Sequence, residues 1–133
     1  GGGATQIHLA RHLRAFAPSQ AGREQLAIDA FAAALEIVPR TLAENSGLDP
    51  IDEIIELSAA QTASTENGAW IGMDVVSGGK VRMDEAGVFD PLFVAHHALA
   101  GATEAANSVL RIDDVLWAKQ DAQTPDWQSE MDD

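Results

Sequence analysis

The sequence predicts a mainly α-helical domain with a small β-hairpin and a C-terminal strand. Four stretches place apolar residues at the three- and four-residue spacing of a helix that faces a core. Between residues 70 and 83, this spacing gives way to two short apolar runs separated by Ser77-Gly78-Gly79. The composition, 46% hydrophobic and 22% charged, is compatible with one folded domain in a chain of 133 residues.

The first two helices are bounded by turn residues. Apolar spacing predicts a helix from residue 4 to about residue 17, and Pro18, Ser19 and Gly22 mark the break after it. A second helix is expected over residues 23–45, with Ser46 and Gly47 as its stop. This second stretch contains Pro39, which is expected to kink or divide it, because proline removes one helix hydrogen bond.

The third helix has a clear start signal. Asp49 is a favourable capping residue, and Pro50 suits the first helical position. The polar run over residues 61–68 predicts a loop. A hairpin is then expected, with strands over residues 70–76 and 80–83.

The last third of the chain holds a fourth helix and a final strand. Asp90 as cap and Pro91 as first residue predict a helix that runs to about Leu110. Residues 112–117 are expected to form the final strand. We place the domain over residues 1–118 and expect the acidic tail over residues 119–133 to be disordered.

The charge balance excludes some classes of partner. The chain has 21 Asp and Glu against 8 Lys and Arg, which gives a formal net charge of −13. Such a surface repels phosphate backbones and anionic lipids, so binding to nucleic acid or to a membrane surface is disfavoured. No apolar run approaches the roughly 20 residues that span a bilayer. The low lysine content favours a halophilic protein, and solubility alone is the simpler reading.

Two further features concern the chain as a whole. There is no cysteine, which excludes disulfides, cysteine–zinc sites and thiol chemistry. The chain begins with Gly1 and not with Met, and we therefore interpret it as a piece of a longer protein.

A few residues carry possible site chemistry. Three glycines open the chain, and glycine lets a backbone lie against a ligand, although a plain turn is the commoner explanation. Asp74 and Asp90 can accept hydrogen bonds from ribose hydroxyls, or can serve as a hairpin residue and a helix cap. His8 and His12 are four residues apart but lack a third ligand, so no metal site is predicted.

Seven segments, in order and with matching spacing, resemble the group II chaperonins, which are the archaeal thermosome and its eukaryotic cytosolic relative. The resemblance covers about residues 1–118, and several of its blocks are six or seven residues long. The segments are Gly1-Gly2-Gly3-Ala4, residues 22–28, 39–45, 47–50, 72–74, 87–91 and 110–114.

This resemblance implies the C-terminal half of the equatorial domain, which in the family binds ATP with Mg²⁺ and makes most ring contacts. The parent would be a cytoplasmic ATPase subunit of a homo- or hetero-oligomeric double ring that folds unfolded proteins. The family's phosphate-binding loop, its catalytic Asp and its Mg²⁺ ligands belong to segments outside these 133 residues. The resemblance therefore implies no catalytic residue in this chain.

The resemblance also assigns four nucleotide-binding positions. Gly2 matches the glycine whose backbone packs against the nucleotide, and Asp74 and Val75 match strand positions beside the adenine. Asp90 matches the carboxylate that bonds the ribose, while residues 112–116 match the strand that pairs with a neighbouring subunit. The alternative function is a non-catalytic helical module that only mediates assembly. A phosphate loop and a catalytic Asp in the parent gene would favour the ATPase.

Overall fold

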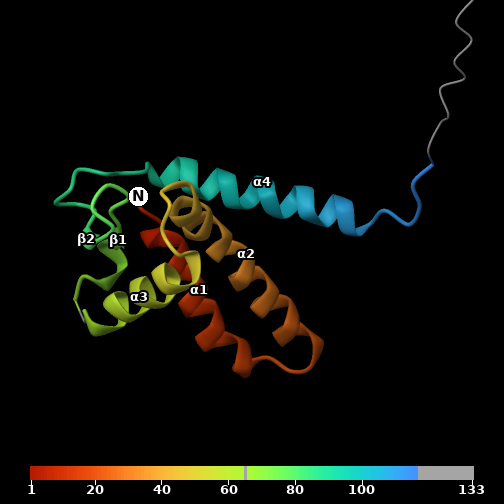
Figure 1. Ribbon diagram of the computed structural model, residues 1–133. Helices are drawn as coiled ribbons and strands as arrows, with labels where there is room; N and C mark the ends of the chain where they lie inside the picture. The colour runs from red at the N-terminus through yellow and green to blue at the C-terminus, as the bar shows by residue number, and fades with distance from the viewer. Residues whose placement is uncertain (65, 117–133) are drawn as a thin grey trace, which may run out of the picture. The chain divides into compact units, whose positions relative to one another are not determined.

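The chain folds into helices with one small sheet, as the sequence predicts. The structure is a computed structural model and describes residues 1–64 and 66–116 (Figure 1). The chain separates into two units: Gly1–Pro91, and a second that begins at Leu92. The candidate site lies in the first unit.

The first unit contains three helices and a two-stranded sheet. The helices are α1 (Ala4–Phe16), α2 (Arg23–Asn45) and α3 (Pro50–Ala63). The strands are β1 (Ile71–Met73) and β2 (Lys80–Arg82). Short 3₁₀ turns, η1 (Ala17–Ser19) and η2 (Gly68–Trp70), follow α1 and precede β1.

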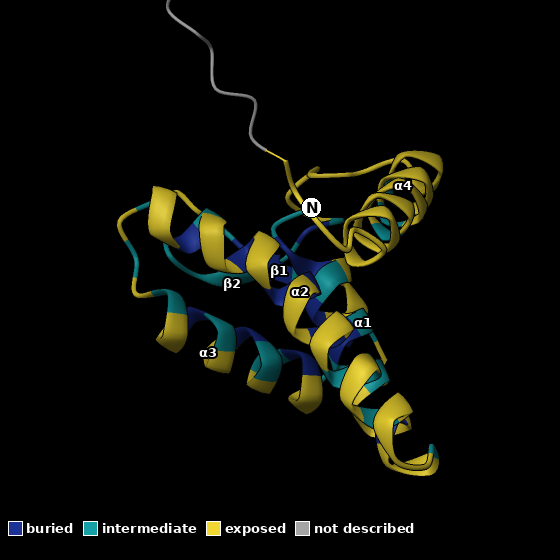
Figure 2. Ribbon diagram, turned by 90° about the vertical axis from the view of Figure 1, so that its right-hand side faces the viewer, coloured by how far each residue is buried: buried dark blue, intermediate teal, exposed yellow. Residues whose placement is uncertain are grey.

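A small core forms where α1 packs against both α2 and α3 (Figure 2). Its members are mostly alanines and a few larger aliphatic side chains, so the helices can approach closely. An ion pair between Arg14 of α1 and Glu36 of α2 adds a polar link, with Arg14 Nη2 2.8 Å from Glu36 Oε2. The buried apolar residues of the helices are Ala4, Ile7, Ala10, Ala32, Leu35, Pro39, Ala43 and Leu57.

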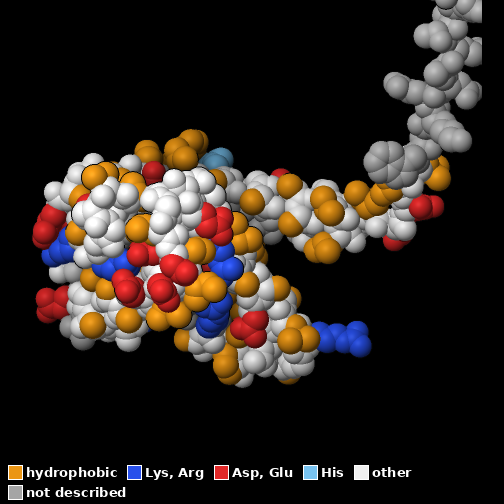
Figure 3. All heavy atoms as spheres, in the orientation of Figure 1, with side chains coloured by type: hydrophobic (Ala, Val, Ile, Leu, Met, Phe, Trp, Pro, Cys, Tyr) orange, Lys and Arg blue, Asp and Glu red, His pale blue; other side chains and the backbone are white. Residues whose placement is uncertain are grey.

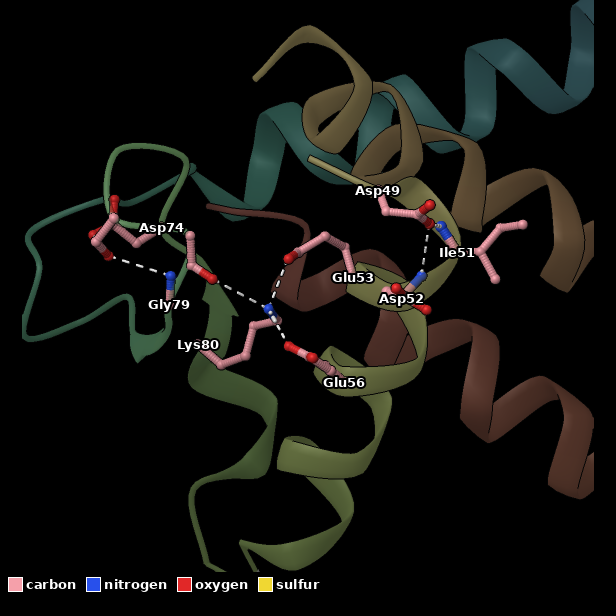
Figure 4. Close-up of polar contacts among 10 residues, drawn as sticks. Asp49, Ile51, Asp52, Glu53, Glu56, Asp74, Gly79 and Lys80 are labelled. Carbon is pink, nitrogen blue, oxygen red and sulfur yellow. Dashed lines mark hydrogen bonds and ion pairs between the residues drawn. The ribbon is translucent and has the colours of Figure 1, made fainter. Parts of the chain in front are cut away.

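The predicted cap of α3 is confirmed. Asp49 Oδ1 accepts hydrogen bonds from the backbone N–H groups of Ile51, at 2.9 Å, and of Asp52, at 3.1 Å (Figure 4). These are donors that the first turn of a helix cannot satisfy by itself. Pro50 occupies the first helical position, where its missing N–H costs nothing.

Two helical predictions need correction. α2 is not divided at Pro39 but runs through it as one helix. The Pro39 ring is fully buried, and an added Cβ on Gly3 would lie only 2.5 Å from its Cβ, so tight packing compensates for the lost hydrogen bond. α3 continues to Ala63, into the predicted loop, because Gln61 is buried and hydrogen-bonded to other segments.

The predicted hairpin is confirmed, with shorter strands than expected. β1 and β2 are antiparallel, and their register pairs Ile71 with Arg82, Gly72 with Val81 and Met73 with Lys80. Residues 74–79 form the turn, since the Asp74 N–H donates to the Gly79 carbonyl at 2.8 Å.

The second unit contains α4 (Leu92–Leu110). It begins one residue later than predicted, so Pro91 and not Asp90 takes the position immediately before the helix. No helix within residues 1–64 and 66–116 has the length and hydropathy needed to cross a bilayer.

The C-terminal strand prediction is wrong for residues 112–116, which form no strand in this chain. A strand needs a neighbouring strand to satisfy its backbone, and no described segment pairs with this one. Trp117, which completed the prediction, and the tail over residues 119–133 lie outside the described residues.

Candidate functional site

The three glycines form the turn that starts α1. Gly2 and Gly3 have φ angles of +60° and +73°, a left-handed conformation that L-residues rarely adopt. The Ala4 N–H donates to the Gly1 carbonyl at 3.1 Å, and Gly3 immediately precedes the helix. We call residues 1–3 the glycine turn.

The glycine turn lies against β1 with no room for side chains. The Met73 N–H donates to the Gly2 carbonyl at 2.8 Å. An added Cβ on Gly2 would lie 2.7 Å from the Met73 carbonyl oxygen and 2.8 Å from Met83 Sδ. A Cβ on Gly72 would lie 2.8 Å from the Gly1 carbonyl oxygen. Glycine is therefore required on both sides of this backbone contact.

The loop after β2 brings Asp90 to the same place. The Val88 N–H donates to the Met83 carbonyl at 3.0 Å, and Val88 fills the space where a Gly1 Cβ would be. Asp90 Oδ2 then lies 3.5 Å from the Gly1 nitrogen. The Asp90 side chain is 65% exposed, so its carboxylate faces solvent at the edge of the glycine turn.

Asp74 follows Met73 directly, but its carboxylate is engaged within the hairpin turn. Asp74 Oδ2 accepts a hydrogen bond from Ser77 Oγ at 2.6 Å, and Oδ1 accepts one from the Val76 N–H at 3.0 Å. The Ser77 hydroxyl, and then the Val76 N–H, lower the pKa of Asp74 below its ordinary value. Val75, the next residue, is 43% exposed.

The structure thus groups the four predicted site residues in part. Asp90 reaches the glycine turn at Gly1, and Gly2 bonds the same turn to Met73 of β1. Asp74 directly follows Met73 in the chain. Val75 lies beyond them in the hairpin turn, with its side chain partly exposed.

Two residues at this place were not among the predicted site residues. Gly72 contacts the glycine turn, and a glycine inside a strand is a known sign of close backbone approach. Gln61 of α3 bonds backbone on both sides of the site, and no local sequence signal marks it.

An ion cluster fixes the hairpin to α3. Lys80 Nζ lies 2.7 Å from Glu53 Oε2 and 2.9 Å from Glu56 Oε2, and 3.3 Å from the Gly78 carbonyl oxygen (Figure 4). Burial disfavours the charged ammonium, but hydrogen bonds to both carboxylates outweigh it and raise the pKa of Lys80 above its ordinary value. The cluster therefore holds the turn that carries Asp74.

The two histidines of α1 form no recognisable metal centre. Within residues 1–64 and 66–116, no group of three or more His, Cys, Asp or Glu side chains is placed to hold a metal ion. His8 and His12 line a shallow hollow with Arg11 and Ala15. The positive charge of the Arg11 guanidinium disfavours binding of a metal cation there.

Comparison with known proteins identifies the family. The sequence model of the TCP-1/cpn60 chaperonin family matches residues 1–120. A thermosome subunit of Methanocaldococcus jannaschii is 58% identical over 120 residues, which are 90% of this chain and 22% of that protein. Thermosome subunit 1 of Haloferax volcanii is 52% identical over 118 residues, which are 89% of this chain and 20% of that protein.

A solved structure supports the same family assignment. The open-state monomer of a group II chaperonin from Methanococcoides burtonii matches with a TM-score of 0.77 and 42% identity, covering 84% of this chain and 27% of that one. The chain thus spans about a fifth to a quarter of the length of these proteins. The chain belongs to the TCP-1/cpn60 chaperonin family, and within it to the group II chaperonins.

Proposed function

We propose that this chain is part of an ATP-dependent, cytoplasmic chaperonin subunit that assists protein folding in a double-ring chamber. Within that subunit, it contributes the base and ribose side of the ATP pocket. The observation that carries this proposal is the position of Asp90, which lies beside Gly1 at the side-chain-free turn that also contains Gly2.

The chemistry of the site fits a nucleoside. The Asp90 carboxylate is exposed and receives no hydrogen bond from a described side chain or backbone amide, so it can accept two from ribose hydroxyls. The exposed Val75 side chain can pack against a planar base. The Asp74 carboxylate is already hydrogen-bonded within the hairpin turn, so in this proposal Asp74 holds the conformation of the turn that carries Val75.

The phosphates and Mg²⁺ fall to other parts of the subunit in this proposal. The Gly-Asp-Gly-Thr type of phosphate-binding loop that the resemblance implies does not occur in the 133 residues, and no described cluster of acidic side chains is placed to hold a metal. Bound ATP would supply the free energy of hydrolysis that drives the chamber. The role of this chain is to hold and orient the nucleoside end.

Exposed apolar faces support a place inside a larger assembly. Two apolar residues of α3 are about three-fifths exposed, and α2 also exposes large apolar side chains on the face away from the core. Surfaces of this kind are usually covered in the working protein. We propose that the rest of the subunit and its neighbours cover them. The exposed residues are Leu26, Phe31, Ile37, Val38, Ile51 and Ile55.

The test is substitution of Asp90 in the intact protein that contains this chain. Asp90→Ser removes the carboxylate and keeps a small polar side chain. A hydrogen bond to a charged group contributes about 1.5–3 kcal/mol, so ATP affinity should fall about tenfold to a hundredfold. Affinity is measured by titration calorimetry, and melting by circular dichroism.

The control is Asp49→Ala, which removes the helix cap of α3. Asp49 is far from the glycine turn in sequence. The substitution should lower the melting temperature and leave ATP affinity unchanged, because a cap contributes only about 1 kcal/mol to stability. Unchanged ATP binding by Asp90→Ser would contradict the ribose contact. An intact protein that forms rings without binding ATP would favour the assembly module, the second candidate, which the exposed apolar faces of α2 and α3 also support.

A further inference from the structure

Gln61 is a polar side chain in the core of the first unit. It lies in the last turn of α3 and is only 3% exposed. Its Nε2 amide donates two hydrogen bonds, to the Ala4 carbonyl at 2.9 Å and to the Ile71 carbonyl at 2.9 Å. Buried amides are costly unless such bonds are made, so the position of this side chain is well determined.

Both acceptors of Gln61 adjoin the candidate site. Ala4 directly follows the glycine turn, and Ile71 lies two residues before Met73. These are the two backbone segments that the bond from the Met73 N–H to the Gly2 carbonyl joins. Gln61 thus forms a second connection between the same segments, on the side of α3.

The backbone of Gln61 holds the same region. An added Cβ on Gly68 would lie 2.3 Å from the Gln61 carbonyl oxygen, so the 3₁₀ turn that leads into β1 packs directly on α3. Side chain and backbone together therefore fix where β1 begins relative to α1.

We propose that Gln61 is the positioning residue of the nucleoside site, an inference that rests on the proposed function. Its amide sets the spacing between the glycine turn and β1, and through it the place of Gly2 and Asp90 relative to Asp74 and Val75. Gln61 itself contacts no nucleotide in this role. Only Nε2 is needed, because Oε1 receives no hydrogen bond from a described residue.

The experiment compares Gln61→Met with wild type in the intact protein. Methionine keeps the length of the side chain and removes both donors. ADP affinity, measured by calorimetry well below the melting temperatures of both proteins, should fall about tenfold, which corresponds to 1.4 kcal/mol. Exchange of the Met73 amide hydrogen should also accelerate, because its bond to Gly2 loses its support.

The control is Leu57→Ala, one turn earlier on α3. Leu57 is fully buried and apolar, so this variant destabilises the same helix without removing a hydrogen bond to the site. It should melt at a lower temperature while ADP affinity and Met73 exchange stay near wild type. Should Gln61→Met fail to fold, Gln61→Asn, which keeps the amide on a shorter chain, takes its place in the same comparison.

The outcomes separate this inference from the proposed function. Wild-type protein that binds no ADP overturns both. Wild-type protein that binds ADP, with Gln61→Met binding equally tightly, overturns the positioning role alone. Equal losses of affinity in Gln61→Met and Leu57→Ala would reduce Gln61 to a general stabilising residue and also overturn it.

Discussion

At the scale of single residues, Gly2 combines a left-handed backbone with a close backbone contact. Gly2→Ala forces a left-handed Ala, which costs about 1–2 kcal/mol, and places its Cβ 2.7–2.9 Å from the backbone of Met73. Overpacking adds about 1–3 kcal/mol, so unfolding free energy should fall by about 3 kcal/mol in chemical denaturation.

Gly47→Ala is a matched control for this prediction. Gly47 also has a positive φ, +74°, but a Cβ added there would meet no atom within 4 Å. Gly47→Ala should therefore cost only the conformational part, about 1–2 kcal/mol. Equal losses in the two variants would show that the contact between Gly2 and Met73 is looser than its geometry indicates.

Asp74 gives the hairpin turn a dependence on pH. Its pKa is lowered in the folded chain by the Ser77 hydroxyl and the Val76 N–H. A lowered pKa stabilises the folded state above the pKa of the unfolded chain, and this stabilisation is lost as pH falls through the folded value. The melting-temperature difference between wild type and Asp74→Asn should shrink from about pH 7 to about pH 2.5, across the ordinary aspartate pKa of about 3.9.

Glu44→Gln serves as the comparison for Asp74→Asn. Glu44 is exposed, and its carboxylate makes no hydrogen bond or ion pair within the described residues. Its substitution should change the melting temperature little at either pH. A wild-type advantage over Asp74→Asn that persists in acid would show that the turn does not depend on the charged carboxylate.

At the scale of elements, the ion cluster of Lys80 joins the hairpin to α3. Lys80→Met leaves Glu53, only 8% exposed, without its cation. Removing one partner of a buried ion pair costs about 3–5 kcal/mol, so the free energy of unfolding should fall by about 3 kcal/mol. Chemical denaturation measures this loss.

Glu56→Gln removes the exposed partner of the same lysine. Its side chain is 64% exposed, and exposed ion pairs contribute at most about 1 kcal/mol, so this variant should remain close to wild type. In the double variant Lys80→Met/Glu53→Leu, neither charge is buried, and much of the lost stability should return. A double variant as unstable as Lys80→Met would assign the loss to packing.

The helices were predictable from local signals wherever those signals act alone. Gly22 and the Ser46–Gly47 stop bound α2 as predicted, and Asp49 caps α3. Local signals do not predict that α2 continues undivided through Pro39 or that α3 continues through Gln61, because both depend on distant segments: Pro39 packs against Gly3, and Gln61 bonds Ala4 and Ile71. Such contacts leave no periodic trace in the sequence.

The candidate site, too, is only partly predictable from local sequence signals. The glycine turn was visible as a motif, but its contact with Gly72 and Met73 joins residues about seventy positions apart. Residue chemistry leaves Asp74 and Asp90 ambiguous, and only the resemblance to group II chaperonins implies a nucleotide role for them. The structure shows that the Asp74 carboxylate is occupied within its turn and that the Asp90 carboxylate is exposed.

At the scale of the whole molecule, the dominant property is negative charge. Acidic side chains are spread over the visible face of the first unit, with apolar side chains exposed between them (Figure 3). The formal net charge of −13 produces self-repulsion that salt screens. The chain should therefore expand at about 0.05 M KCl and become compact at about 2 M, since the Debye length falls severalfold over this range.

Circular dichroism measures this change, with sucrose at equal osmolality as the control for effects other than screening. Sucrose favours compact states without screening charge, so it should not reproduce the transition at low ionic strength. A helical signal that is constant over the whole range of KCl would contradict halophilic adaptation.

The bond between Gly2 and Met73 also fixes an order of events during synthesis. Translation proceeds at about 5–20 residues per second, so the glycine turn leaves the ribosome roughly 4–14 seconds before the strand that it contacts. Until then, the Gly2 carbonyl lacks its bond to Met73, and closing so long a loop carries an entropic cost. The proposed nucleoside site therefore cannot form before the hairpin and Asp90 have been synthesised, and nascent chains lacking the hairpin should have no such site.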